Sequence, residues 1–220
     1  ALYDSRHEKK PEATRLHRLA EMPLNWLGYK LVFVDVNGTL PRGEELGRYR
    51  GIVTWFSEPL ADAKEYLSWL DSATGAGLRL ACLAELAPPE PAGTQEVVSR
   101  IFARLGLRYS DQYVKVTYKS KLLTVNREMA GFERPIDKVL PEFPVLQPAS
   151  AAAQVHLSAS VADIDGVPSS ALIVTSPGGG YAVRATFPIV DDTTPTTVTP
   201  TTELPIDVLD RVALARQALG

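Results

Sequence analysis

Short apolar runs alternate with stretches of helical periodicity along the first 110 residues. β-branched and aromatic runs predict strands at residues 30–36, 51–56 and 78–83, and residues 1–4 are predicted to be the end of a further buried strand that runs into a polar turn. Apolar residues at spacings of three and four predict helices at residues 11–28, 62–74 and 94–105, with Pro23 ending or kinking the first of them. Strands that alternate with helices in this way are typical of a doubly wound α/β domain with a mostly parallel sheet.

After residue 109 the pattern changes to a strict alternation of apolar and polar residues. This alternation at 114–118 and 155–161 predicts half-buried antiparallel strands, and it places His156 on the polar face of the second strand. Asp165 and Gly166 predict a hairpin turn, and the glycine-rich residues 176–180 predict another one between two apolar runs. An antiparallel, β-rich half is therefore expected to follow the α/β half.

We expect four parts along the chain. Residues 1–110 form the doubly wound α/β core, and residues 111–190 form an antiparallel β-rich extension of the same domain. Residues 191–205 are dominated by threonine and proline, a composition with too little apolar surface to order itself, which predicts a surface loop. Residues 206–220 have helical periodicity and predict a closing helix that leads into a further domain. Since the chain opens inside a strand and without methionine, we expect an internal piece of a longer protein.

Composition and charge exclude several classes of protein. Of the 220 residues, 45% are hydrophobic and 22% are charged, as in an ordinary globular domain, so the chain is neither disordered nor collagen-like. The 23 Lys and Arg residues against 26 Asp and Glu residues leave a net charge of −3, which disfavours nucleic acid as a partner. No apolar run approaches the roughly 18 residues of a membrane-spanning helix, so no membrane span is expected.

The residue types that usually carry catalysis form no motif. Cys82, the single cysteine, lies inside an apolar strand pattern without flanking glycines, so it is predicted to be a buried, inert thiol. The hydrolase pattern Gly-x-Ser-x-Gly does not occur, and no Gly-x-Gly-x-x-Gly follows the first strand. His7, His17 and His156 are too scattered to indicate a metal site. The sequence therefore predicts no catalytic residue, no metal and no cofactor.

One candidate binding site follows from the position of polar and aromatic residues at the carboxyl ends of the predicted strands. In an open parallel sheet, ligands bind beyond the carboxyl ends of the strands where the winding reverses, which in the flavodoxin-like order lies between the first and third strands. The candidate ligand-binding residues at the ends of these strands and of the fourth are Asp4, Arg6, Glu8, Trp55, Ser57, Glu58 and Glu85. Carboxylates, a guanidinium and an aromatic face are suited to a sugar or another hydroxyl-rich group.

A purely structural interpretation of these residues is the alternative. In it, Asp4 and Ser57 cap helices. Arg6 pairs with Glu8 or Glu58 at the surface, and the Trp55 ring belongs to the core.

Four segments carry a resemblance that covers nearly the whole chain. They are Leu-Tyr-Asp-Ser-Arg at 2–6, Ala-Glu-Met-Pro-Leu-Asn-Trp-Leu-Gly at 20–28, Tyr-Arg-Gly-Ile-Val-Thr-Trp-Phe at 49–56 and Leu-Ala-Arg-Gln-Ala-Leu-Gly at 214–220. In these segments the chain resembles the flavodoxin-like middle domain, also described as reductase-like or amidotransferase-like, of the PelA-type exopolysaccharide biosynthesis proteins.

The resemblance implies a place in the Pel system of biofilm exopolysaccharide biosynthesis, in a protein exported to the periplasm. In such proteins a glycoside hydrolase barrel precedes this domain and a polysaccharide deacetylase domain follows it. The acidic pair of the hydrolase and the metal ligands of the deacetylase do not fall in this stretch, so no catalytic residue is carried over. The implied function is that of a noncatalytic accessory domain, whose partners are the neighbouring hydrolase and deacetylase domains and the polysaccharide itself.

Two other functions stay open at this point. An oxidoreductase-like domain would bind a flavin or a nicotinamide at the mouth between the first and third strands, where loop amides and Arg6 would meet the phosphate. An unusual hydrolase would use Cys82 or Ser57 to attack an amide or an ester.

Overall fold

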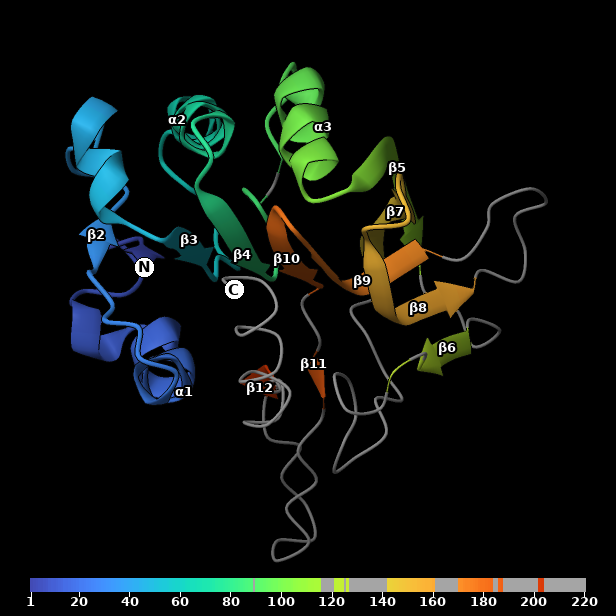
Figure 1. The fold of residues 1–220 in the computed structure, drawn as a ribbon, viewed down its shortest axis with the longest axis horizontal. Helices are drawn as coiled ribbons and strands as arrows, with labels where there is room; N and C mark the ends of the chain where they lie inside the picture. The colour runs from blue at the N-terminus through green and yellow to red at the C-terminus, as the bar shows by residue number, and fades with distance from the viewer. Residues whose placement is uncertain are drawn as a thin grey trace, which may run out of the picture.

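A computed structural model describes residues 1–88, 90–115, 121–124, 126, 142–160, 170–183, 186–187 and 202–203. The strands of its main sheet are β1 (Leu2–Tyr3), β2 (Val34–Asp35), β3 (Gly51–Thr54), β4 (Arg79–Leu83), β6 (Lys121–Thr124), β8 (Gln154–Ser160), β9 (Ser170–Ser176) and β10 (Gly179–Ala182). They lie in the order β2-β1-β3-β4-β10-β9-β8-β6 (Figure 1). The first five run parallel and the last three join them antiparallel, so the protein has the mixed α/β architecture that the sequence predicts.

Helices cover both faces of the parallel part of the sheet. They are η1 (Pro11–Ala13), η2 (His17–Glu21), α1 (Met22–Trp26), η3 (Gly43–Arg48), α2 (Ala63–Gly75) and α3 (Gln95–Arg104). In Figure 1, α2 and α3 lie above the sheet and α1 lies below it. Two layers of helices around a parallel sheet bury it on both sides, which explains why β3 and β4 are almost continuously apolar.

Helices α2 and α3 confirm the elements predicted at 62–74 and 94–105. The Asp62 side chain accepts a hydrogen bond from the Glu65 backbone N–H at 3.0 Å and so caps α2. The two helices are tied together by Asp71 on α2, which accepts from Arg100 on α3 at 2.9 and 3.0 Å and also from Arg104. Local periodicity was sufficient here because each helix buries a single apolar stripe.

The helix predicted at 11–28 is divided into three short pieces. A wide π-helical turn, η2, stands directly before α1, and the helical structure continues past Pro23 as far as Trp26. Pro23 has no N–H to donate and its ring crowds the preceding turn, so the hydrogen-bond pattern changes ahead of it.

The strand predicted at 30–36 is reduced to the two residues of β2. This strand lies at the edge of the sheet and pairs only with β1, which is itself two residues long. Val32 is exposed, although its backbone carbonyl accepts a hydrogen bond from the amino group of Ala1 at 3.0 Å. Apolar composition alone therefore overestimated the length of this edge strand.

The turn predicted at 176–180 is confirmed, and it has a consequence for the whole sheet. Strand β9 turns at Pro177 and Gly178 into β10, which pairs antiparallel with β9 and parallel with β4. A Cβ atom on Gly179, whose φ is +136°, would lie 1.9 Å from the Leu80 carbonyl oxygen. Glycine thus allows β10 to approach β4 and join the β-rich half to the α/β half.

Two other predictions for the β-rich half need correction. His156 is only 2% exposed and does not lie on a polar face, because β8 is covered on both sides and Thr175 on β9 provides a hydroxyl 2.7 Å from the His156 Nε2 atom. The strand expected at 114–118 begins earlier, as β5 (Leu107–Lys115), which pairs with β7 (Glu142–Pro148) in a separate antiparallel ribbon.

A third short pair, β11 (Thr186–Phe187) with β12 (Thr202–Glu203), places two residues of the expected 191–205 loop in a strand. The hairpin turn at 165–166 and the closing helix at 206–220 lie outside the described residues.

Candidate functional site

The carboxyl ends of the parallel strands meet along one edge of the sheet. The chain order reverses between β1 and β3, because β2 adds on one side of β1 while β3 and β4 add on the other. This is the position at which open α/β sheets bind ligands. Two groups of polar side chains lie along this edge, one beyond β1 and β2 and one beyond β4 and β10.

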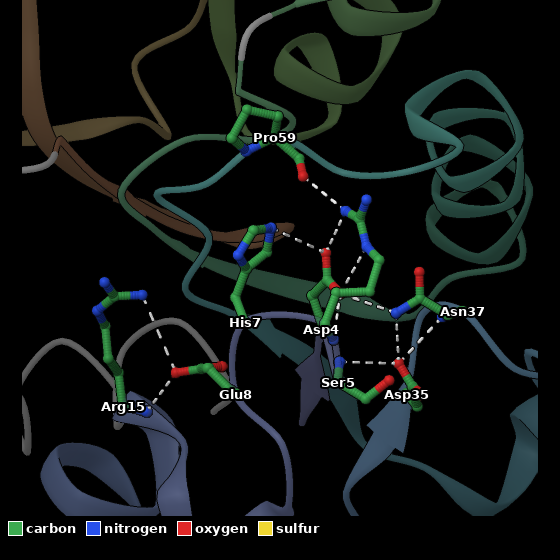
Figure 2. Close-up of polar contacts among 9 residues, drawn as sticks. Asp4, Ser5, His7, Glu8, Arg15, Asp35, Asn37 and Pro59 are labelled. Carbon is green, nitrogen blue, oxygen red and sulfur yellow. Dashed lines mark hydrogen bonds and ion pairs between the residues drawn. The ribbon is translucent and has the colours of Figure 1, made fainter.

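The first group is organised around a buried carboxylate, that of Asp4, which is 3% exposed. Arg6 grips it with two nitrogens: Nη2 lies 2.6 Å from Oδ2 and Nε lies 3.1 Å from Oδ1. The same Nη2 also donates to the Pro59 carbonyl at 2.6 Å (Figure 2). The partner of Arg6 is therefore Asp4, and neither Glu8 nor Glu58, and the pair ties the loop after β1 to the loop after β3.

Asn37, which follows β2, joins this pair to a second carboxylate. Its Nδ2 donates to Asp4 Oδ1 at 2.8 Å and to Asp35 Oδ1 at 2.9 Å, and Asp35 also accepts from the Ser5 backbone N–H at 3.2 Å (Figure 2). Burial acts to raise the pKa of both carboxyl groups, but these hydrogen bonds outweigh it and lower both pKa values. Both groups are therefore carboxylates at neutral pH.

Asp35 and Asn37 were not in the predicted set. The sequence signal was present, since a polar pair stands at the carboxyl end of the second predicted strand. The Asn37-Gly38 dipeptide was interpreted only as a turn.

Four of the predicted residues lie apart from the Asp4 pair. Figure 2 shows Glu8 turned toward Arg15, whose backbone N–H lies 2.7 Å from Glu8 Oε1. Trp55 is 5% exposed and belongs to the core, so its ring offers no face to a ligand. Ser57 is buried and Glu58 is exposed in the loop after β3.

The seventh predicted residue, Glu85, lines a cavity of about 400 Å³ beyond the ends of β4 and β10. The loop after β4 supplies Glu85 and Glu90, α3 supplies Phe102, and β10 supplies Tyr181. Strand β5 completes the wall with Tyr109 and Tyr113, and aliphatic side chains and Pro144 line the remaining surface. The size and the mixture of rings with a few polar groups are those of a small-molecule site.

Glu90 is the polar centre of this cavity. Its Oε2 accepts hydrogen bonds from the Tyr109 hydroxyl at 2.6 Å and from the Tyr113 hydroxyl at 3.3 Å. An irregularity in the β5–β7 pairing between Tyr109 and Tyr113 inserts extra residues at this point. Such bulges redirect side chains and are frequent next to binding sites.

The tyrosines of the cavity stay protonated over the ordinary pH range. Burial, together with the field of Glu90, raises the pKa of Tyr113 to about 12. Burial and the hydrogen bond with Glu90 raise the pKa of Tyr109 further. Both hydroxyls are therefore neutral, and both donate hydrogen bonds to Glu90.

The turn that leads into this cavity contains a strained residue. Ala84 has a φ of +86°, in the left-handed region that favours glycine. Its backbone N–H donates to the Ala182 carbonyl at 2.8 Å, which ties the turn to the end of β10. Strain of this kind is most often found at functional sites, and here it stands beside Glu85.

Cys82 is buried in β4, as the apolar pattern predicts. Burial raises the pKa of its thiol to about 12, so the thiolate needed for nucleophilic attack is scarce at neutral pH. Within the part of the chain that the structure describes, no three His, Cys, Asp or Glu residues gather as a metal site. The helices in that same part are all too short or too polar to cross a membrane.

Glu90, Tyr109 and Tyr113 were not among the residues that the sequence predicts for a site. Tyr109 and Tyr113 follow Glu90 by 19 and 23 residues in the sequence. Glu90 is on a proline-rich loop, and the two tyrosines are on a strand that was expected to start later. No local pattern links them, because the contact depends on how β5 returns past the end of β4. Compared with known proteins, the chain matches no family model and no curated sequence.

Proposed function

We propose that this chain is a noncatalytic accessory domain that binds a saccharide in the cavity around Glu90. We further propose that it does so within an exported, multidomain, polysaccharide-modifying protein of the Pel type. The observation that carries the proposal is the cavity itself: tyrosine rings and carboxylates gathered at the carboxyl edge of the sheet. Rings that stack on a sugar and carboxylates that accept from its hydroxyls are the usual means of binding a hydroxyl-rich ligand.

The strand order supports the resemblance to flavodoxin-like domains. In those folds the order is 2-1-3-4-5, and here β2-β1-β3-β4 is followed by β10 in the place of the fifth strand. The partner domains, the periplasmic location and the Pel system are inferred from the resemblance in the sequence.

The state of the polar groups supports a noncatalytic function. The Cys82 thiol is buried with a raised pKa, which opposes a thiol hydrolase. The guanidinium of Arg6 is already bound to Asp4 and to the Pro59 carbonyl. The Arg6 guanidinium thus holds the loops after β1 and β3 together.

The alternative of a flavin or nicotinamide site is weaker for an electrostatic reason. A phosphate bound beyond β1 would lie beside the carboxylates of Asp4 and Asp35, both with lowered pKa values. Like charges repel, and the guanidinium of Arg6 in this cluster is engaged by Asp4.

The test is direct binding. Short oligosaccharides of neutral and amino sugars are titrated into the chain by calorimetry, and flavin mononucleotide is titrated in parallel. We expect saturable binding of a saccharide that is lost in Tyr113→Leu and kept in Tyr49→Leu, a tyrosine outside the cavity. Saturable flavin binding, or saccharide binding indifferent to Tyr113, would contradict the proposal.

The accessory function is tested in the longer protein. Removing this domain should lower turnover of polymer more than turnover of a short oligomer, because only the polymer needs a second place to be held. Equal turnover of both substrates with and without the domain would overturn it.

A further inference from the structure

The outer edge of β2 carries no further strand. Strand β2 is the first in the order of the eight-stranded sheet and pairs only with β1, at the left end of the sheet in Figure 1. The Ala1 amino group donates to the Val32 carbonyl at 3.0 Å, and the Val34 N–H donates to the Ala1 carbonyl at 2.9 Å. Residues 32 and 34 therefore turn their backbone polar groups toward β1. Because these groups point alternately to the two sides of a strand, those of Leu31 and Phe33 point away from it.

The backbone groups of Leu31 and Phe33 can pair with a strand from outside the domain. Within the described part of the chain, no hydrogen bond reaches the backbone of either residue. An open edge is a template for pairing with another chain, and proteins usually protect it with charged residues or a proline. Residues 31–34, Leu-Val-Phe-Val, contain neither. The edge is therefore suited to an extended strand, rather than to a helix or a small molecule.

The side chains of this edge are held in place but incompletely covered. Phe33 is packed from one face of the sheet by the rings of Tyr3 and His17, with ring centroids 6.5 and 6.4 Å away. Leu31 and Phe33 are nevertheless only partly buried, and Val32 is 45% exposed. The edge is thus fixed by its own domain before any partner arrives, and its apolar side chains still have area to bury.

The charges of the segment favour a second copy of this chain as the partner. Lys30 stands at its start and Asp35 at its end. Antiparallel pairing of two copies brings the positive end of each strand beside the negative end of the other, whereas parallel pairing would place like charges together. Antiparallel pairing centred on Val32 also sets Leu31 of each copy opposite Phe33 of the other. Apolar residues then face each other, and both pairs exchange their backbone hydrogen bonds.

We propose that the chain forms a symmetric dimer by antiparallel pairing of the β2 edges of two copies, with Val32 on the two-fold axis. The sheet of each copy then continues into the sheet of the other. The two Val32 residues form a non-hydrogen-bonded pair, the kind in which Cα atoms are about 4.5 Å apart and side chains lie closest. This pairing buries the side chain that a single chain leaves exposed. The inference does not depend on the saccharide cavity, which lies beyond the ends of β4 and β10.

Sedimentation equilibrium of the 220-residue chain tests the dimer, over concentrations from about 1 μM to about 1 mM, which cover weak and moderate association. Val32→Lys should raise the dissociation constant of the dimer about tenfold or more, since it places two like charges at the axis. Ser68→Lys makes the same kind of change at an exposed position of α2 and should leave the constant unchanged. Circular dichroism checks that both variants fold. A chain that is monomeric at every concentration, or a dimer that Val32→Lys does not weaken, would overturn the proposal.

Cysteine cross-linking tests the register of the pairing. Val32→Cys places the thiols of the two copies opposite each other, at a Cα separation that a disulfide spans, so mild oxidation should give a covalent dimer. Val34→Cys is the matched control, because the pairing sets residue 34 opposite Lys30 of the second copy and keeps its two thiols out of reach. The native Cys82 is buried and does not compete. No cross-linking of Val32→Cys, or equally fast cross-linking of Val34→Cys, would overturn the pairing.

Discussion

At the residue scale, the Asp4 carboxylate decides how the carboxyl edge of the sheet responds to pH. Burial alone would raise its pKa, and the hydrogen bonds from Arg6 and Asn37 lower it below its ordinary value. A carboxyl group with a lower pKa in the folded state stabilises that state above the unfolded pKa of about 4 and loses the contribution as pH falls through the folded pKa. Asp35 has a lowered pKa and acts in the same direction.

Asp4→Asn should lower the free energy of unfolding by about 1–2 kcal/mol at pH 7, because Arg6 and Asn37 lose a charged acceptor. The difference from the original protein should begin to shrink as pH falls below about 4, where the carboxyl group of the unfolded state takes up a proton, and it should be lost only as pH falls through the lowered pKa of the folded state. Urea unfolding of both proteins at pH 7 and pH 3 measures this, with the exposed Glu44→Gln as a control. A difference that is the same at both pH values would contradict the explanation.

Cys82 is expected to be unreactive in the folded protein. Its thiol is fully buried and burial raises its pKa to about 12, so a thiol-specific reagent should label it only when the protein unfolds. Labelling followed across a urea series should track the unfolding transition. Cys82→Ser should cost about 1 kcal/mol of stability, because it buries a hydroxyl in an apolar strand, and should leave ligand binding unchanged.

At the element scale, the β9–β10 turn is the joint between the two halves of the sheet. It depends on close backbone approach, since a Cβ atom on Gly178 would lie 2.0 Å from the Arg104 carbonyl oxygen and one on Gly179 would lie 1.9 Å from that of Leu80. Neither oxygen can yield, because each belongs to the backbone of a helix or strand packed in the core.

Gly179→Ala should therefore lower the free energy of unfolding by about 3 kcal/mol or more, through overpacking and a strained φ. The control is Gly47→Ala in η3, where the added methyl meets nothing within 4 Å, and which should raise stability by about 0.5 kcal/mol. Thermal unfolding of the two variants measures the contrast. Similar melting temperatures for both would show that β10 does not need the close approach to β4.

At the scale of the whole molecule, the α/β half and the β-rich half share one sheet. Strand β10 lies between β4 and β9, and its Tyr181 is buried against Phe102 of α3. The α/β half without β10 would expose one side of β4 and remove a ring from its own core. Edge strands that are long and apolar are also prone to pair with other chains.

A fragment of residues 1–115 should therefore retain helical content without a cooperative unfolding transition, whereas the 220-residue chain should unfold in one. Circular dichroism and calorimetry of the two chains compare them. A fragment that unfolds cooperatively at the temperature of the longer chain would mean that the α/β half is complete without β10.

Much of the α/β half could be predicted because its signals are local. The apolar stripe and the Asp62 cap of α2 lie within one segment, and each of β3 and β4 is a single apolar run. The order of the strands beyond β1 was also accessible, since short connections and right-handed crossovers leave few alternatives. The reversal of the winding between β1 and β3 is therefore where the sequence predicts it, whereas the cavity lies beyond the ends of β4 and β10.

Contacts between segments that are distant in the sequence were decided only by the tertiary structure. The sequence determined that Asp4 and Arg6 follow β1, but their pairing depends on the loops after β2 and β3 that close around them. His156 is buried and its Nε2 lies 2.7 Å from the hydroxyl of Thr175, 19 residues away on β9, and Glu90 meets Tyr109 and Tyr113 because β5 returns past β4. Periodicity reports which face of an element is apolar, whereas a site is made of groups whose distance is set by the path of the chain between them.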